Sequence, residues 1–123
     1  MTKKLLFTLR HAPYGNSIAK EAIDAVLAAS AYGQTLTVLF MDDGVFQLVQ
    51  QQQTIECDHN KQEKNIAKLI SALAIYDVEP LFACAESLQQ RGLSLEQLCD
   101  NVILLTKDDM HKLLQTQDHL LSF

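Results

Sequence analysis

Five short apolar runs, separated by segments with helical spacing, are the feature that most constrains the fold of this 123-residue chain. Most of the runs lack the strict alternation of apolar and polar residues that marks a strand with one face in water. They are typical of strands that are covered on both faces. The runs occupy residues 5–9, 36–41, 81–84, 102–105 and 119–121. Strands that alternate with helices predict βαβ units, and therefore a mostly parallel sheet.

The segments between the runs predict helices. Asn16 and Ser17 form a plausible N-cap, and apolar residues recur at helical spacing from Ile18 to Ala29. The other helical segments are predicted over 44–51, 61–74, 86–91, 94–99 and 108–116. An apolar fraction of 48% over this length fits one compact core. We therefore expect an α/β fold made of a single small domain over 1–123, with a mostly parallel five-stranded sheet, helices on both faces and flavodoxin-like layering.

Composition indicates the cellular compartment of the chain and argues against two kinds of binding partner. The three cysteines stand at 57, 84 and 99 without a Cys-x-x-Cys pair, which favours a reducing compartment over a secreted disulfide framework. No apolar run approaches the ~20 residues of a membrane span, and residues 1–4 lead straight into the first run. A net charge of −5 opposes direct binding to a phosphate backbone. We expect a cytoplasmic chain with no direct contact to nucleic acid or membrane.

Cys84 is the candidate residue for chemistry. It ends the apolar run 81–84, and a helix-forming segment follows at once. If the run is a parallel strand, Cys84 lies at its carboxyl end, where open α/β sheets bind ligands, and a helix amino terminus there favours the reactive thiolate. The alternative is a packing role, because free cysteine is among the most buried residue types. The residues alone leave both interpretations open.

A polar loop follows the first predicted strand and would share the sheet edge with Cys84. Its residues Arg10, His11 and Tyr14 could hold an anion or a thiolate. The loop lacks the glycine pattern of a phosphate cradle, and Pro13 removes one backbone donor. An ordinary turn before a helix explains the same residues.

Asp42 and Asp43 close the second run, and paired carboxylates at a strand end suggest a metal site or a phosphorylated receiver domain. A receiver domain carries acidic residues after its first strand, but this chain has Arg10 and His11 there. A receiver also carries its phosphoacceptor aspartate at the end of the third strand, where this chain has Cys84. The better interpretation is that Asp42 or Asp43 caps a helical segment that begins at Gly44.

Other metal and catalytic patterns are weak. Cys57 and His59 offer two zinc ligands, but a structural zinc site uses four, so we predict no metal and no cofactor. His111 and His119 stand alone and are expected to be solvated. Cys99 falls on the apolar side of its segment and is expected to pack.

Several segments together resemble one known family. They are residues 12–15, 21–25, 43–48, 73–77 and 84–88, followed by 91–93 and the final Phe123. In their order and spacing they resemble the DsrE/DsrF-like sulfur-relay family, most closely its TusC (DsrF) branch. The stretch 43–48, Asp-Gly-Val-Phe-Gln-Leu, is the most particular to that branch, and the resemblance spans the whole chain.

The resemblance implies a subunit of a heterohexamer that also contains TusB-like and TusD-like homologous subunits. Such a complex carries persulfide sulfur from a cysteine desulfurase, through a small carrier, towards 2-thiolation of the wobble uridine of certain tRNAs. Cys84 matches the persulfide position of the D-type subunit, whereas the C-type subunit is regarded as a scaffold. Gln89 and Gln90 replace more charged residues of the family, which weakens a positive field near Cys84.

We therefore expect a sulfur-relay subunit that is mainly a scaffold without turnover of its own. The sulfur-oxidation (Dsr) counterpart of the relay is one alternative. A flavodoxin-like module that binds a small ligand is another, and a freestanding thiol enzyme is a third.

Overall fold

The computed structural model describes residues 3–14, 17–49, 60–78 and 80–123. Cys57 and His59 lie outside this part of the chain, and so do the predictions made for them. In the part that is described, no helix combines the length and the apolar character needed to span a membrane.

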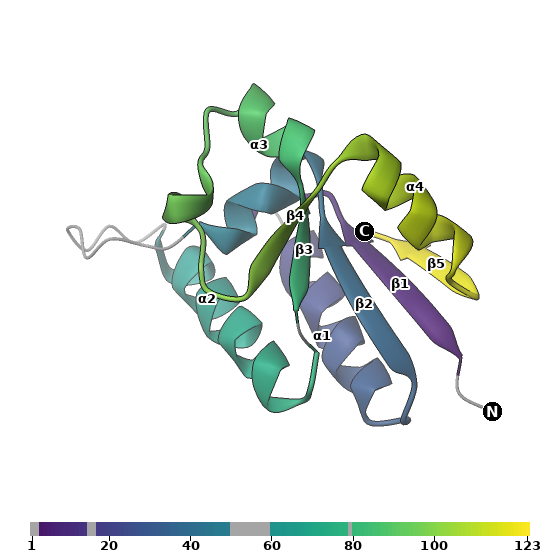
Figure 1. The fold of residues 1–123 in the computed structure, drawn as a ribbon. Helices are drawn as coiled ribbons and strands as arrows, with labels where there is room; N and C mark the ends of the chain where they lie inside the picture. The colour runs from purple at the N-terminus through teal and green to yellow at the C-terminus, as the bar shows by residue number, and fades with distance from the viewer. Residues whose placement is uncertain (1–2, 15–16, 50–59, 79) are drawn as a thin grey trace.

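The centre of the fold is a five-stranded sheet in the order β4-β3-β2-β1-β5 (Figure 1). The strands are β1 (Lys4–Leu9), β2 (Thr35–Phe40), β3 (Leu81–Cys84), β4 (Val102–Leu105) and β5 (His119–Ser122). Every neighbouring pair is parallel, which confirms the predicted sheet. All five strands therefore present their carboxyl ends at one edge.

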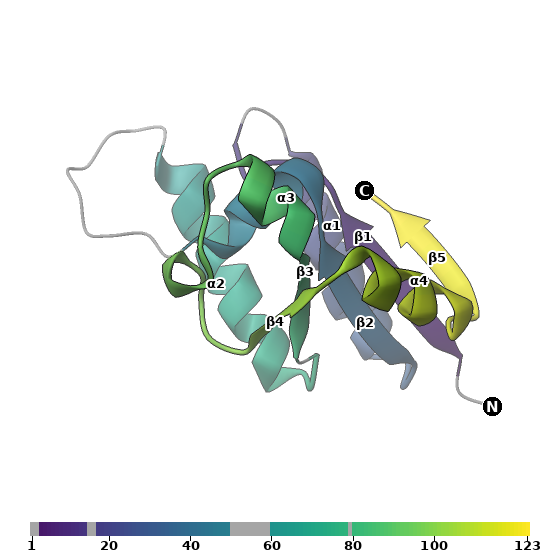
Figure 2. The ribbon, with the colours of Figure 1, turned by 45° about the horizontal axis from the view of Figure 1, so that its top comes forward.

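Helices lie on both faces of the sheet, as predicted. The α-helices are α1 (Ile18–Ser30), α2 (Asn60–Ile75), α3 (Ala85–Gln90) and α4 (Lys107–Gln115), and two 3-10 helices are η1 (Asp42–Leu48) and η2 (Leu95–Gln97). α1 and α2 cover one face, and α4 lies on the other (Figures 1 and 2). The order of the strands explains this. The chain moves from β1 to β4 in one direction and then returns across the sheet to β5, and right-handed crossovers put the returning helix on the opposite face.

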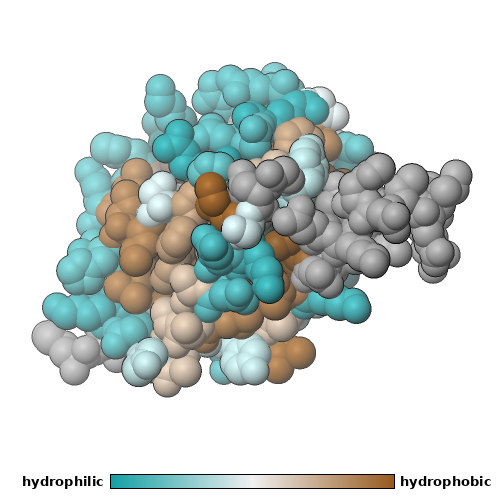
Figure 3. All heavy atoms as spheres, turned by 180° about the vertical axis from the view of Figure 1, so that it is seen from behind, coloured by the Kyte–Doolittle hydropathy of each residue, from teal (hydrophilic) through white to brown (hydrophobic). Residues whose placement is uncertain are grey.

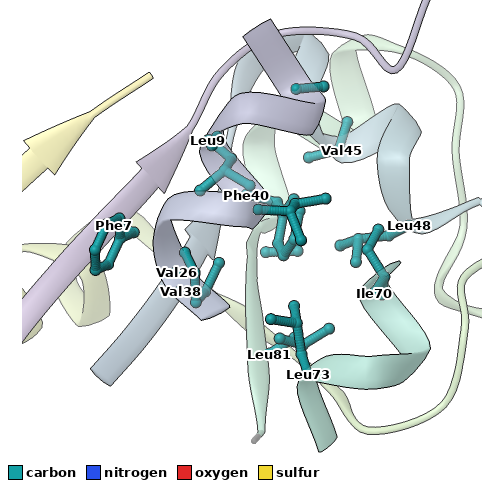
Figure 4. Packing of buried hydrophobic residues seen from close by; sticks show 14 of the residues in the cluster. Phe7, Leu9, Val26, Val38, Phe40, Val45, Leu48, Ile70, Leu73 and Leu81 are labelled. Carbon is teal, nitrogen blue, oxygen red and sulfur yellow. The ribbon is translucent and has the colours of Figure 1, made fainter. Parts of the chain in front are cut away.

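The main core lies between the sheet and the pair α1 and α2 (Figure 4). Strand residues that point to this side meet apolar residues of the two helices and of η1. The cluster includes Phe7, Leu9, Val26, Val38, Phe40, Val45, Leu48, Ile70, Leu73 and Leu81. Each such side chain contributes about 1.5–3 kcal/mol when it is fully removed from water, so this layer is the main source of stability.

The strands differ in how well they are covered. The last residues of β1 and β2 are buried on both faces of the sheet, as their apolar sequences predict. The edge strands β4 and β5 are not, because Ile103 is 47% exposed and Leu120 is 55% exposed. α4 has no buried residue of its own. The prediction of strands covered on both faces is therefore wrong for the two edges. On the opposite side of the molecule, seen from α1 and α2, apolar side chains also form a broad part of the surface (Figure 3).

One local prediction is confirmed in part, and another is wrong. Ser17 occupies the N-cap position of α1, but its side chain makes no capping hydrogen bond. The segment predicted over 44–51 is the 3-10 helix η1, and its N-cap residue is Met41 rather than Asp42 or Asp43. Both aspartates lie in the first turn, and their side chains have other partners.

Candidate functional site

The carboxyl edge of the sheet brings three predicted site segments together. Arg10 follows β1, Asp42 and Asp43 follow β2, and Cys84 is the last residue of β3. The parallel order confirms that the loop after β1 and Cys84 share an edge. β2 lies between β1 and β3, however, so the ends of these two strands are about 10 Å apart at the usual strand spacing.

Cys84 is buried in the protomer, with 4% of its surface exposed. It pairs with Leu105 of β4 in the parallel ladder, and it directly precedes α3. By the alternation of strand residues it points to the same side of the sheet as Phe82, which is the α4 side. α3 has only six residues, and the Cys84 side chain makes no capping hydrogen bond to it. The thiol is therefore enclosed in the fold and is not presented to solvent.

Asp42 joins the ends of β1 and α3. Its carboxylate Oδ2 accepts a hydrogen bond from Arg10 Nε at 2.7 Å. Its backbone N–H donates to the hydroxyl oxygen of Ser87 at 2.9 Å, and Ser87 is buried. Asp42 has φ of 51°, a left-handed conformation that aspartate tolerates better than most residues. One residue thus positions two segments that flank the site.

Asp43 makes the second ion pair of this edge. Its Oδ1 accepts from Arg91 Nε at 3.0 Å. The Nη1 of Arg91 also donates to the carbonyl oxygen of Ser87 at 3.2 Å. The guanidinium group of Arg91 is therefore matched by a carboxylate and a carbonyl of its own surroundings. Together with the Arg10 pair, these contacts give the guanidinium groups of Arg10 and Arg91 acidic partners other than a Cys84 thiolate.

The loop after β1 is not assembled around Cys84. Arg10 is bound to Asp42, and its side chain is 53% exposed. The side chain of Tyr14 is exposed as well. For His11, the contact that the structure gives is made by its backbone carbonyl oxygen, which accepts a hydrogen bond from Gln47. Among the described residues, no hydrogen bond or ion pair joins Arg10, His11 or Tyr14 to Cys84, and that these three residues could hold an anion or a thiolate stays a prediction.

Sequence analysis missed Gln47. This residue is 5% exposed, and its Nε2 donates to the carbonyl oxygen of His11 at 2.7 Å. Its Oε1 is buried, with no hydrogen-bond partner among the described residues. Gln47 lies in the stretch Asp-Gly-Val-Phe-Gln-Leu, so the only signal in the sequence was a polar residue inside an apolar segment. It holds the loop after β1 against η1.

Cys99 packs as predicted. It lies half-buried against the main core, and its backbone N–H donates to the carbonyl oxygen of Leu48 at 2.9 Å. Burial raises the pKa of its thiol, and the neighbouring Asp100 carboxylate raises it further against the opposing effect of a backbone hydrogen bond. His111 and His119 are exposed, as expected. Within the described residues, no three His, Cys, Asp or Glu side chains are grouped so that they could hold a metal ion.

Comparison with known proteins gives consistent matches over the full length. The model of the DsrE/DsrF-like family matches residues 3–123. A Vibrio vulnificus protein named TusC homolog is 39% identical, with 98% of each chain covered. A Pseudomonas aeruginosa protein of the same name is 34% identical, with 99% of each chain covered.

Two solved structures share the fold. The ychN protein of E. coli superposes with a TM-score of 0.78 at 22% identity and full coverage of both chains. A Methanobacterium thermoautotrophicum protein of unknown function, MTH1491, gives a TM-score of 0.71 at 14% identity, with 98% of this chain and 99% of that chain covered. At these identities the likeness concerns the fold alone.

Proposed function

Since the chain belongs to the DsrE/DsrF-like family, we propose that it is the TusC-type subunit of a heteromeric sulfur-relay complex. The observation that carries this proposal is the identity of 39% to a TusC homolog over 98% of both chains. The complex would pass persulfide sulfur towards 2-thiolation of the wobble uridine of tRNA, in the cytoplasm.

The proposed partners are TusB-like and TusD-like homologous subunits in a heterohexamer. Apolar residues on the edge strands and on α4 support association, because Ile103, Leu114 and Leu120 are each more than 40% exposed, at 47%, 43% and 55%. Large exposed apolar side chains on neighbouring elements are typical of surfaces that other chains cover.

Within the complex we propose a scaffold role rather than a sulfur-carrying one. Transfer of persulfide sulfur needs attack by a thiolate, and the attacking sulfur must be accessible. Cys84 is 4% exposed, and the guanidinium groups of Arg10 and Arg91 have carboxylate partners. These features favour a chain that positions its partners and has no turnover of its own.

The test is to purify the chain after co-expression with TusB-like and TusD-like subunits, supply a labelled sulfur donor, and map persulfides by mass spectrometry. We expect a stable complex that carries label on a partner cysteine and none on Cys84. Cys84→Ser should assemble and relay as the unmodified chain does, with Cys99→Ser as the matched control. A chain that elutes alone in the presence of both partners would refute membership. Label on Cys84 would refute the scaffold role while leaving membership intact.

A further inference from the structure

β4 forms one edge of the sheet, and its outer side is open (Figures 1 and 2). Leu81 of β3 pairs with Val102, and the Leu81 N–H donates to the carbonyl oxygen of Asn101 at 3.0 Å. Backbone groups of successive residues in a parallel strand point to opposite sides, so those of Val102 and Leu104 face away from β3. No described residue bonds to them there. Each of these two residues therefore offers one N–H and one C=O to a further strand.

β4 lacks the features that usually prevent an edge strand from pairing. Natural proteins protect such edges with proline, with charged side chains or with a bulge. The sequence of β4 is Val-Ile-Leu-Leu, which contains neither proline nor a charge. Its register with β3 is regular over all of its residues, so the strand has no bulge. Nothing in β4 itself opposes the addition of another strand.

A pocket of about 310 Å³ lies at the beginning of this edge. Val102 lines it, together with residues of the segment 95–101 that leads into β4. The apolar lining includes Leu95 and Leu98, and Leu95 is 49% exposed. In recognition by strand addition, the backbone edge supplies the hydrogen bonds and neighbouring pockets take individual side chains of the added strand. The edge of β4 and this pocket have that relationship.

The charges of the pocket are acidic. Glu96 and Asp100 line it, and both are exposed. None of the described lining residues is basic, and the ion pairs found in the described part of the chain involve other carboxylates. A second copy of the chain would bring a net charge of −5 and the same two carboxylates to this edge. Charge complementarity therefore favours a basic partner over self-association.

We propose that the edge of β4 binds an extended, basic segment of another protein chain, which adds a strand to the sheet. The backbone of this segment bonds to Val102 and Leu104, one of its apolar side chains enters the pocket, and its lysine or arginine side chains face Glu96 and Asp100. The proposal is independent of the proposed relay function, because it rests on the backbone edge of β4 and the pocket beside it.

The test titrates the full chain with a blocked hexapeptide of alternating valine and lysine and follows amide hydrogen exchange by NMR. At saturation, exchange of the Val102 and Leu104 amides should slow roughly tenfold or more, because these amides become hydrogen-bonded. The Ile103 amide faces β3 and should be unaffected. A peptide of alternating valine and glutamate should not bind. Absence of binding by the lysine peptide, or protection at β5 instead of β4, would refute the proposal.

Two matched comparisons separate the backbone contribution from the charge contribution. Methylation of alternate backbone nitrogens of the lysine peptide should weaken its binding roughly tenfold, because the ladder bonds are lost. Glu96→Gln combined with Asp100→Asn should weaken binding roughly threefold to tenfold at low salt and less at high salt.

The control for the charge comparison is Glu21→Gln combined with Asp24→Asn, which removes the same number of charges from α1 and should leave binding unchanged. Equal losses in both double variants would mean that only the net charge matters, and equal binding of the methylated peptide would mean that no strand is added. Protection of the Val102 and Leu104 amides without peptide, in a chain that sediments as a dimer, would identify a second copy as the occupant. Each of these results would overturn the proposal.

Discussion

The Cα of Gly44 packs directly against the carbonyl group of Leu9, so that a Cβ at position 44 would overlap the Leu9 oxygen. The same oxygen accepts a hydrogen bond from the backbone N–H of Met41 at 3.0 Å. η1 is thereby seated on the carboxyl end of β1, and the turn that contains Asp42 and Asp43 is placed between β1 and α3. This close approach, and not a positive φ, is the reason for glycine here.

We predict that Gly44→Ala destabilises the domain by at least about 3 kcal/mol, because the added methyl group forces backbone atoms of Leu9 to move. Gly33→Ala is the control, since Gly33 has φ of +71° but nothing within 4 Å of an added Cβ. It should cost only about 1 kcal/mol. Urea denaturation measures both variants, and equal losses would contradict the close contact.

Phe40 is fully buried between β2 and the helices of the main core. Phe40→Ala should lower the free energy of unfolding by about 3–5 kcal/mol, through lost burial and the cavity that remains. Tyr32→Ala removes another aromatic ring, but Tyr32 is 78% exposed, so the change should stay within about 0.5 kcal/mol. Thermal or chemical unfolding distinguishes the two, and a mild effect at Phe40 would show that the core is elsewhere.

The Arg10–Asp42 pair is short at 2.7 Å, but its side chains are 53% and 40% exposed. We expect a double-mutant cycle with Arg10→Ala and Asp42→Ala to give a coupling energy below about 1 kcal/mol that falls as salt is added. Its main role is then to orient the turn. A coupling that is large and insensitive to salt would mean that the pair is shielded from water in the assembled protein.

The Cys99 thiol should make stability depend on pH in the alkaline range. Burial raises its pKa above the ordinary value of 9.0, so the folded state keeps its proton longer than the unfolded state does. The unfolded chain binds fewer protons in this window, and stability must therefore fall as the pH rises from about 9 through the folded pKa. Cys99→Ala should show a smaller decline in melting temperature between about pH 8 and about pH 10. Identical profiles would contradict the assignment.

Much of the fold followed from local patterns. All five predicted strands exist, and their bounds differ from the predicted ones by one residue at most. The helices predicted over 61–74 and 108–116 are α2 and α4 with small shifts of their ends. These predictions succeeded because apolar spacing reflects burial within one element. The position of Cys84 at a strand end followed from the same pattern.

The contacts around Cys84 could not be predicted from local sequence patterns. Asp42 and Asp43 looked like helix caps because a local pattern cannot reveal partners that are 32 and 48 residues away in the chain. Gln47 was missed because its hydrogen bond to His11 spans 36 residues. Whether the thiol is open or enclosed depends on several elements at once, and no single segment contains that information.

The sequence by itself determined which segments are strands and helices and the order in which they alternate, since spacing along the chain records which side of each element faces the interior. Only the tertiary structure decided that β5 returns to lie beside β1, that Gly44 meets Leu9, and that the acidic turn holds Arg10 and Arg91. The physical reason is that these contacts depend on the relative placement of complete elements, and that placement is settled when the whole sheet is packed.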